Sequence, residues 1–339
     1  TCNFYYLAFL SGRRKENQDT VSIGEPTITI QLPIYNEKYV AKRLIDSVCD
    51  LDYPKQKIRI MVLDDSDDNT TEQVAELVHN YKSRGFDISH VRRGTRQGYK
   101  AGALKYAMKY TKSEFVAIFD ADFIPPTWYL KRAISYFAKP NIGFVQCRWG
   151  HVNENYSALT QAQALSLDFH FLVEQKAKSN SRMFMNFNGT AGIWRKECID
   201  DSGGWHTATL VEDLDLSYRA QMKGWKCLFI PDIVVNAELP VQMNGAKRQQ
   251  FRWAKGSIQC AIKLLGGILL KRKIAIDAKL QAFVQLTRHI VFPLMLIQFL
   301  ALPILLASNV NLYIVSFLPV VTLATYLAMG PGAYLFIIH

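Results

Sequence analysis

Residues 115–122 read Phe-Val-Ala-Ile-Phe-Asp-Ala-Asp, and this stretch decides how the rest of the chain is arranged. The apolar run 115–119 predicts a strand that is buried on both faces of a sheet. Asp120 and Asp122 follow it, at the end of the strand where open α/β sheets bind ligands. Carboxylates are costly to desolvate there unless a cation satisfies them. The stretch predicts a Mg²⁺ or Mn²⁺ ion shared with phosphate groups, with a solvated turn as the alternative.

The chain before this stretch alternates strands and helices. Residues 27–32 predict a first strand that Pro33 stops, and residues 58–63 predict a second strand that ends in the acidic pair 64–65. A short third strand is expected at 88–91, with helices between the strands. This alternation with short connectors predicts a parallel, doubly wound α/β sheet whose acidic strand ends share one edge.

The edge formed by these strand ends is expected to hold a nucleotide. Neither glycine-rich phosphate fingerprint, GxGxxG or GxxxxGK[ST], follows the first predicted strand. The sequence therefore disfavours dinucleotide-dependent dehydrogenases and P-loop proteins as function classes.

Two later segments have the composition of ligand-binding elements. Residues 184–194 mix aromatic residues with glycines and small polar groups, which fits a sugar-binding loop and equally a plain turn of the core. Gln249, Arg252 and Trp253 share one face of a predicted helix. An amide, a guanidinium and an indole suit phosphate binding with stacking on a sugar. An amphipathic interfacial helix with a tryptophan anchor is the other interpretation, and the two are compatible.

A further predicted helix begins with a cluster of acids. Residues 211–213 read Val-Glu-Asp and open the helix, and Asp215 follows within its first turn. Acids in a first helical turn usually complement the helix dipole, which is worth a few tenths to about 1 kcal/mol each. That effect alone would account for Glu212 and Asp215.

Charged residues are frequent up to about Lys279 and nearly absent after Arg288, which marks a change of solvent from water to lipid. Residues 290–307 and 310–329 are apolar runs of membrane-spanning length, and a third run begins at residue 334. Near the start, the apolar residues 4–10 precede three basic residues. This pattern predicts either a frayed N-terminus or the end of a transmembrane helix, with the basic residues on the cytosolic side of the membrane.

The overall charge fits a membrane surface better than nucleic acid. The formal net charge is +11 and the pI is near 9.3, but no zinc-ligand spacing, RNA-binding signature or basic heptad accompanies them. Basic residues that flank membrane segments explain the surplus, and no nucleic-acid partner is expected. The six cysteines are scattered without a CxxC pair, which predicts reduced packing residues in a cytosolic domain.

Four motifs occur together and in order: Asp64-Asp65, Asp120-Ala121-Asp122, Val211-Glu212-Asp213 and Gln249-x-x-Arg252-Trp253. As a set they resemble the D, DxD, TED and QxxRW motifs of processive membrane-bound family 2 glycosyltransferases, which include cellulose, hyaluronan, chitin and mannan synthases. The resemblance covers roughly residues 27–253. It is closest to the cellulose synthase-like group that includes the plant glucomannan synthases, through the stretches 31–37, 98–104 and 187–192.

The resemblance implies a GT-A fold, which is a Rossmann-like doubly wound α/β domain, followed by transmembrane helices. The protein is then expected to be an integral, multi-pass membrane protein with a cytosolic catalytic domain and the lipid bilayer as a partner. The implied organisation is the end of an N-terminal transmembrane helix with its basic flank at 1–15, the GT-A domain at 16–257, amphipathic interfacial helices at 258–288 and transmembrane helices at 289–339.

The resemblance also implies roles for individual residues. Asp213 is the expected catalytic base, and Asp122 with Asp120 is expected to hold the divalent metal, Mg²⁺ or Mn²⁺. Contacts with the donor nucleotide are expected from Pro33, Tyr35, Glu37, Asp65, Lys100 and Asp120. Contacts with the diphosphate or the acceptor are expected from Gln249, Arg252, Trp253, Glu212, Asn188, Gly189 and Thr190.

The implied reaction is the inverting transfer of a hexose from a nucleotide-sugar donor, UDP-glucose or GDP-mannose, to a growing β-linked polysaccharide. A glycolipid synthase that adds a sugar to a membrane lipid is the nearest alternative, and a nucleotide-binding membrane regulator without catalysis is another. The sequence departs from the family pattern in two places. Val211 stands where the family usually has threonine near the acceptor, and no FxVTxK-type gating segment is found in the C-terminal part. Both leave acceptor contacts and processivity open.

Overall fold

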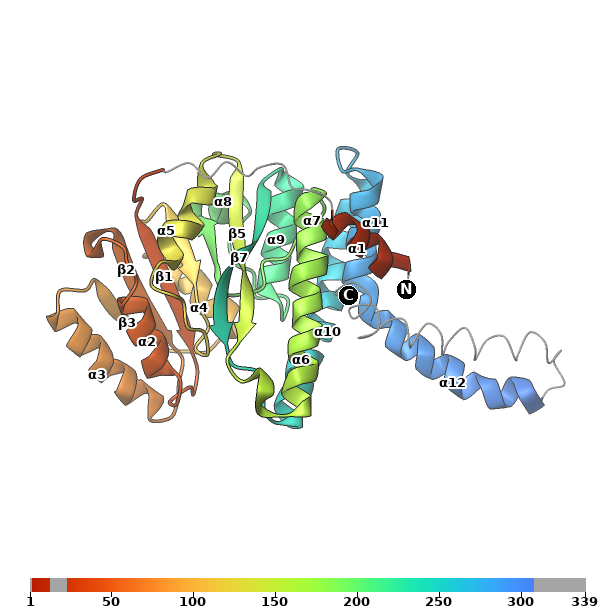
Figure 1. Ribbon diagram of the computed structural model, residues 1–339, viewed down its shortest axis with the longest axis horizontal. Coiled ribbons are helices and arrows are strands. Elements are labelled where there is room, and N and C mark those ends of the chain that lie inside the picture. The colour runs from red at the N-terminus through yellow and green to blue at the C-terminus, as the bar shows by residue number, and fades with distance from the viewer. Residues whose placement is uncertain (1, 13–22, 308–339) are drawn as a thin grey trace.

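The structure is a computed structural model that describes residues 2–12 and 23–307 of the chain. A seven-stranded sheet forms the centre of the molecule, with helices on both of its faces, and the long helix α12 projects away from this body (Figure 1). The strands lie in the order β3-β2-β1-β4-β6-β5-β7. Their bounds are β1 Ile28–Ile34, β2 Ile58–Asp64, β3 Ile88–Arg92, β4 Phe115–Ile118, β5 Ile142–His151, β6 Gly192–Arg195 and β7 Lys226–Ala237.

Strand β4 lies in the middle of the sheet and is buried on both faces, as predicted. Phe115 and Ala117 pack into a core formed with helices α2, α3 and α5. Val116 and Ile118 point to the opposite face, into a second core formed with α4, α8 and α9. These helices are α2 Ala41–Cys49, α3 Thr70–Ser83, α4 Tyr99–Met108, α5 Tyr129–Ile134, α8 Lys196–Asp201 and α9 Glu212–Lys223.

The sheet is mixed, whereas the sequence predicts parallel pairing. Strands β3, β2, β1 and β4 are parallel to one another, but β6 is antiparallel to both β4 and β5. The reason lies in the segment 186–191, which returns across the carboxyl end of β4, where the Ala191 N–H donates to the Ile118 carbonyl at 2.9 Å. A strand that enters the sheet from that end must run in the opposite direction.

Pro33 lies inside strand β1 and does not stop it, so that prediction was wrong. The Gln31 carbonyl accepts a hydrogen bond from the Phe119 N–H on the β4 side, whereas the Ile34 carbonyl accepts from the Asp65 N–H on the β2 side. Backbone groups two residues apart on a strand face the same neighbour. The missing N–H of Pro33 therefore faces the β4 side, where β4 has ended at Ile118, and no ladder bond is lost.

Residues 158–180 form one continuous helical rod of three consecutive segments. They are α6 Ala158–Asp168, the π-helical turn η4 Phe169–Gln175 and α7 Lys176–Asn180. The Ser157 side chain accepts from the Thr160 N–H at 3.2 Å and caps the first segment. This helical rod runs along one side of the sheet and contacts α1 Cys2–Gly12 through a small apolar cluster that includes Leu7 and Leu10.

The last described part of the chain is mostly helical. Its helices are α10 Met243–Leu270, α11 Ile276–Thr287, the turn η5 Arg288–Ile290 and α12 Val291–Ala307. Among the described residues, the stretch Ile276–Ala301 is the one that is long and apolar enough to cross a membrane. The apolar runs predicted to span at 310–329 and from 334 lie outside the described residues.

Five of the six cysteines have described surroundings, and these five behave as the sequence predicts for packing residues. Cys49, Cys147, Cys198 and Cys260 are buried, Cys227 is half-buried, and all five are free thiols.

Candidate active site

Two carboxylates follow β4 at the carboxyl edge of the sheet, and one of them is held by direct contacts. The Asp120 N–H donates to Thr190 Oγ1 at 2.9 Å, and one Asp120 carboxylate oxygen lies 2.5 Å from Lys100 Nζ. Lys100 is in the first turn of α4, and Thr190 precedes β6. The structure thus brings together three of the predicted site residues from three separate elements.

Asp122 is the carboxylate of this pair that has no counter-charge beside it in the described contacts. Burial, followed by the nearby charge of Asp120, raises the pKa of Asp122 to about 7. Burial and Asp120 also raise the pKa of Glu37, which lies at the rim of the same acidic group. Ionised carboxylates crowded in this way are stabilised by a hard cation.

The acidic pair fits a Mg²⁺ or Mn²⁺ ion. Among the described residues, no three histidine, cysteine or acidic side chains converge on one point, so the chain supplies two carboxylates and not a complete cage. Mg²⁺ is usually held by one or two carboxylates together with substrate phosphates, and Mn²⁺ accepts the same oxygen donors. Asp122 and Asp120 provide such a donor set.

The loop that contains Asn188, Gly189 and Thr190 closes the site from the other side. The Gly189 carbonyl accepts a hydrogen bond from Lys100 Nζ at 3.0 Å, and Gly189 has a φ of +83°. A Cβ atom on Gly189 would lie 3.1 Å from a carboxylate oxygen of Asp213 and 3.3 Å from Lys100 Nζ. Glycine is therefore favoured here by its backbone conformation, and a Cβ atom would crowd both side chains.

Asp213 stands at the start of α9, facing this loop. Burial, followed by the adjacent charge of Glu212, raises the pKa of Asp213 to about 7. One of its oxygens accepts the Leu214 N–H at 2.8 Å, which fixes the orientation of the carboxylate. Burial also raises the pKa of Glu212, although Lys100 Nζ, 4.0 Å away, opposes that shift. A carboxylate with a pKa near 7 is suited to accept a proton at neutral pH.

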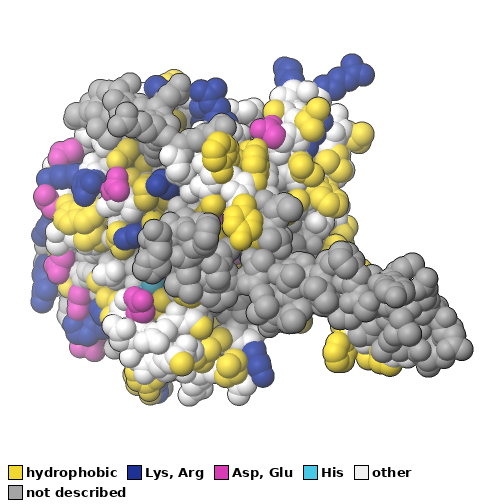
Figure 2. All heavy atoms as spheres, turned by 45° about the vertical axis from the view of Figure 1, so that its right-hand side comes forward, with side chains coloured by type: hydrophobic (Ala, Val, Ile, Leu, Met, Phe, Trp, Pro, Cys, Tyr) yellow, Lys and Arg dark blue, Asp and Glu magenta, His cyan; other side chains and the backbone are white. Residues whose placement is uncertain are grey.

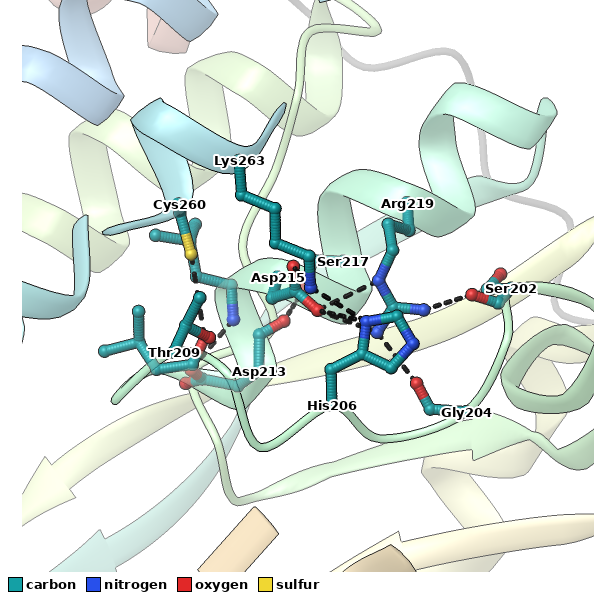
Figure 3. Close-up of polar contacts among 12 residues, drawn as sticks. Ser202, Gly204, His206, Thr209, Asp213, Asp215, Ser217, Arg219, Cys260 and Lys263 are labelled. Carbon is teal, nitrogen blue, oxygen red and sulfur yellow. Dashed lines mark hydrogen bonds and ion pairs between the residues drawn. The ribbon is translucent and has the colours of Figure 1, made fainter. Parts of the chain in front are cut away.

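Asp215, two residues further on, belongs to a different group of charges. Figure 3 shows its carboxylate between Arg219 and Lys263, with His206 beside them. Asp215 is fully buried, and its oxygens lie 2.8 Å from the Arg219 guanidinium, 2.7 Å from Lys263 Nζ and 3.5 Å from His206 Nδ1. Lys263 is on α10, so this group joins α9 to α10. The dipole effect expected for Asp215 is therefore accompanied by buried ion pairs.

Helix α10 carries Gln249, Arg252 and Trp253 along this side of the site. Arg252 is exposed, and its charge lowers the pKa of Glu212 against the larger effect of burial, which places the guanidinium near the acidic cluster. Gln249 is half-buried, and the half-buried Trp253 packs on an apolar cluster that includes Val211. The QxxRW segment therefore lies next to the start of α9, although its residues stand at different depths.

The β1–β2–β3 side of this edge contains cationic residues that the sequence motifs did not predict. The Arg93 guanidinium makes two contacts with the Asp65 carboxylate, one of them at 3.0 Å. The Arg96 guanidinium lies over the Tyr35 ring, 3.1 Å from its centroid, and Tyr35 Oη lies 3.5 Å from an oxygen of Asp67. Both arginines follow β3, so the rule that ligands bind at the carboxyl ends of strands would have identified them.

Comparison with known proteins gives a family match for most of the chain. Residues 26–256 match the family model described as "Glycosyltransferase like family 2". The probable glucomannan 4-beta-mannosyltransferase 7 of Oryza sativa subsp. japonica is 42% identical over 276 residues, covering 79% of this chain and 47% of that protein. Glucomannan 4-beta-mannosyltransferase 2 of Arabidopsis thaliana is 42% identical over 264 residues, covering 76% of this chain and 49% of that protein. The chain spans about half the length of these relatives.

Solved structures show the same fold. A mannosyltransferase, PcManGT, from Pyrobaculum calidifontis, in complex with GDP-Man and Mn²⁺, superposes with a TM-score of 0.75 at 21% identity over 99% of this chain and 90% of its own. S. aureus TarS 1–349 in complex with UDP-GlcNAc gives a TM-score of 0.55 at 17% identity over 78% of this chain and 72% of its own. The α/β domain is thus a GT-A-like fold with a mixed sheet.

Replacing Gly189 should damage the site more than it damages the fold. Gly189→Ala introduces a methyl group between Asp213 and Lys100, whereas Gly85→Ala places one in open space at an almost identical φ of +82°. Both variants should lose about 1–2 kcal/mol of stability from the left-handed backbone. We expect thermal unfolding to shift similarly in both variants, while nucleotide-sugar turnover falls only in Gly189→Ala. Equal turnover in the two variants would show that the close approach at Gly189 is unimportant.

The raised pKa of Asp213 makes a prediction about stability. Its pKa of about 7 in the folded protein exceeds the value of about 3.9 in an unfolded chain. Because the folded state then holds its proton to higher pH, wild-type stability falls as the pH rises towards 7 and the penalty stays constant above 7. Asp213→Asn removes that penalty and keeps an acceptor for the Leu214 N–H, so its Tm should exceed that of wild type at both pH values, and by more at pH 8 than at pH 5.

The matched control for this measurement is Asp87→Asn, because Asp87 is exposed. Its Tm should follow that of wild type at both pH values. A lower Tm for Asp213→Asn than for wild type at pH 8 would instead identify Asp213 as a stabilising complement to the helix dipole.

Proposed function

The chain belongs to glycosyltransferase family 2, and we propose that it transfers mannose from GDP-mannose, with inversion, to a growing β-linked mannan or glucomannan chain. The observation that carries the proposal is the convergence of Lys100 and Asp213 on Gly189 at one edge of the sheet, with Asp120 bound to Lys100 and Asp122 beside Asp120. The identity of about 42% to plant glucomannan 4-beta-mannosyltransferases supports mannose as the sugar. GDP-Man and Mn²⁺ in the similarly folded mannosyltransferase support the donor and the metal.

Asp213 is proposed as the catalytic base. Its pKa of about 7 lets the carboxylate be ionised at neutral pH and still take the proton of an attacking acceptor hydroxyl. In-line attack by that hydroxyl inverts the anomeric carbon, so an α-linked donor gives a β-linked product without a covalent enzyme intermediate. The hydrogen bond from the Leu214 N–H holds the carboxylate in one orientation during this step.

The leaving diphosphate is proposed to lie between the β4 carboxylates and the cations of α4 and α10. Asp122 and Asp120 would hold Mg²⁺ or Mn²⁺, and this ion would supply positive charge to the diphosphate when bound. Lys100 is already aimed at the site by Asp120 and the Gly189 carbonyl. Lys100 and Arg252 would neutralise the charge that develops on the leaving group, and Gln249 would donate to it from the same helix face.

The nucleoside is proposed to bind at the ends of β1 and β2. Pro33, Tyr35, Glu37 and Asp65 lie at these strand ends. The two contacts from Arg93 fix the Asp65 carboxylate, so its remaining lone pairs have a defined direction. A fixed acceptor is what recognition of the N–H groups of a nucleobase requires.

The acceptor sugar is proposed to lie near Trp253 and the loop 188–190. Trp253 presents part of its indole beside the start of α9, close to the proposed base. Indole faces stack on sugar rings and would orient the hydroxyl for attack. Asn188, Gly189, Thr190 and Glu212 would complete the wall on the opposite side.

The test is an assay of the chain purified in detergent, supplied with Mn²⁺, a β-mannan oligosaccharide and either GDP-mannose or UDP-glucose. We expect mannose transfer from GDP-mannose and its loss in excess EDTA. Asp213→Asn should lower turnover about 10²–10⁴-fold because the amide cannot take the proton, while GDP-mannose affinity is retained. Asp122→Asn should lower the affinity for Mn²⁺ and, with it, the affinity for GDP-mannose.

Each alternative has a distinct result in the same assay. Transfer to lipid alone would identify a glycolipid synthase, and binding without turnover of any donor would identify a nucleotide-binding regulator. Near-normal turnover by Asp213→Asn would refute the catalytic assignment.

We further propose that helices α11 and α12 attach the domain to a membrane, with the catalytic domain on the cytosolic side. Large apolar side chains of these helices, including Ile276, Leu280 and Phe299, are exposed. Figure 2 shows apolar side chains gathered on the α11 side of the molecule, with basic side chains at its tip. A row of exposed apolar side chains beside the basic residues Lys271, Arg272 and Lys273 suits a bilayer with an anionic surface.

The membrane proposal predicts that the chain stays in the pellet after carbonate extraction of membranes. A chain released into the carbonate supernatant would contradict it. Cleavage of the α/β domain by a protease that acts only from the outside of cells would overturn the orientation.

A further inference from the structure

The π-helical turn Phe169–Gln175 places a histidine and a glutamate beneath the active-site loop. His170 Nδ1 lies 2.8 Å from a carboxylate oxygen of Glu174, one turn further along. His170 Nε2 lies 2.9 Å from Asn188 Nδ2, in the loop next to Gly189. Extra turns of this kind within α-helices frequently occur at functional sites.

Hydrogen bonds from Gln175 fix the orientation of the Asn188 amide. The Gln175 amide donates to the Asn186 carbonyl at 2.7 Å and accepts from the Asn186 N–H at 3.3 Å, so its own orientation is determined by the backbone. Its Nε2 also donates to Asn188 Oδ1 at 2.5 Å. The other end of the Asn188 amide, Nδ2, must therefore donate to His170.

This arrangement determines which nitrogen of His170 carries the proton. A ring nitrogen that accepts from Asn188 Nδ2 has no proton, so Nε2 is bare and the single proton is on Nδ1, where it is donated to Glu174. A second proton on Nε2 would face the Asn188 N–H group and break the contact. The loop is thus held by the neutral form of His170, in one tautomer.

The surroundings of His170 agree with a neutral ring. Burial lowers the pKa of His170, Glu174 opposes that shift, and the cations Lys178 and Arg288 add to it. Burial also lowers the pKa of Lys178 to about 8. An Arg288 nitrogen lies 3.6 Å from the Glu174 carboxylate, and Arg288 begins the turn η5 that precedes α12.

The segment that His170 holds is the one that organises the proposed reaction centre. Asn188 is adjacent to Gly189, whose carbonyl orients Lys100 and whose Cα faces Asp213. The next residue, Thr190, accepts the N–H of Asp120. We therefore expect a shift of the Asn188 side chain to disturb Gly189 and Thr190, which contact Lys100 and the backbone of Asp120 and lie beside Asp213.

We propose that His170, oriented by Glu174, is a positioning residue for the loop 188–190 and thereby for sugar transfer. It does not touch the reacting atoms. The proposal rests on the proposed function for its effect on turnover, but its effect on the loop can be measured separately.

Two substitutions of His170 separate its two hydrogen bonds. The amide of His170→Gln reaches the position of Nε2 and can accept from Asn188, whereas the shorter amide of His170→Asn reaches only the position of Nδ1 and can donate only to Glu174. We expect His170→Gln to retain most of the wild-type kcat. His170→Asn should lose about 10- to 100-fold in kcat, because small displacements of a reacting group have costs of that size, with a smaller change in the KM for GDP-mannose.

The matched control is His151→Gln. His151 also has a buried side chain, on β5, and lies 3.5 Å from Asp168 and not beside the loop. Its kcat should equal that of wild type. The Tm of every variant is measured alongside. If His170→Asn and His151→Gln have the same Tm, a larger loss of kcat in His170→Asn supports the positioning role.

Hydrogen exchange of the backbone amides at 186–191 tests the proposal without any turnover. His170→Asn should speed exchange in this segment relative to wild type, and His170→Gln should not. If wild type transfers no sugar, the proposed function fails while this measurement still decides on the loop. Unchanged exchange and unchanged kcat in His170→Asn, or equal losses in both His170 variants, would overturn the positioning role.

Discussion

The structure depends on how four carboxylates are held around one ammonium group. Asp120, Asp122, Glu212 and Asp213 surround the site, and Lys100 contacts Asp120 directly and lies 4.0 Å from Glu212. Burial and mutual repulsion raise the pKa of both Asp122 and Asp213 to about 7. The fold therefore holds negative charge where it is unfavourable in the free protein. A divalent cation that arrives with the diphosphate would balance the charge of the carboxylates, and Lys100 and Arg252 would balance the charge of the diphosphate, so the destabilised carboxylates favour binding of the proposed metal-bound donor.

Neutral hydrogen bonds and ion pairs outside the site make this arrangement possible. Gly189 allows the loop to pass between Lys100 and Asp213, and buried Gln146 supports that loop by accepting the Asn188 N–H at 2.8 Å and donating to the Thr190 carbonyl at 3.0 Å. On the far side of α9, the buried Asp215 pairs with residues of α9 and α10. The start of α9 is thus fixed from both sides. Its carboxylates cannot move apart to relieve their repulsion.

The sequence was sufficient for the features that depend on local pattern. Apolar runs that end in acids predicted strands β2 and β4, and the strand-end rule placed Asp65, Asp120 and Asp122 on one edge, as found. Features that depend on distant partners could not be read in this way. The direction of β6 follows from the path of the 186–191 loop, the ion pairs of Asp215 involve α10, and the contact of His170 with Asn188 joins residues from separate elements. Residue spacing contains no information about such contacts.

The structure shows what contacts Val211, the residue that stands where the family usually has threonine. A Cβ atom on Gly256 would lie 2.6 Å from a methyl carbon of Val211, so glycine at this point of α10 lets the helix lie directly on the residue that precedes Glu212 and Asp213. An apolar contact here excludes water from the start of α9 in a way that a threonine hydroxyl would not. Desolvation is the largest cause of the raised pKa of Asp213. The valine and the close helix packing therefore shield the residue before Glu212 and Asp213 from water.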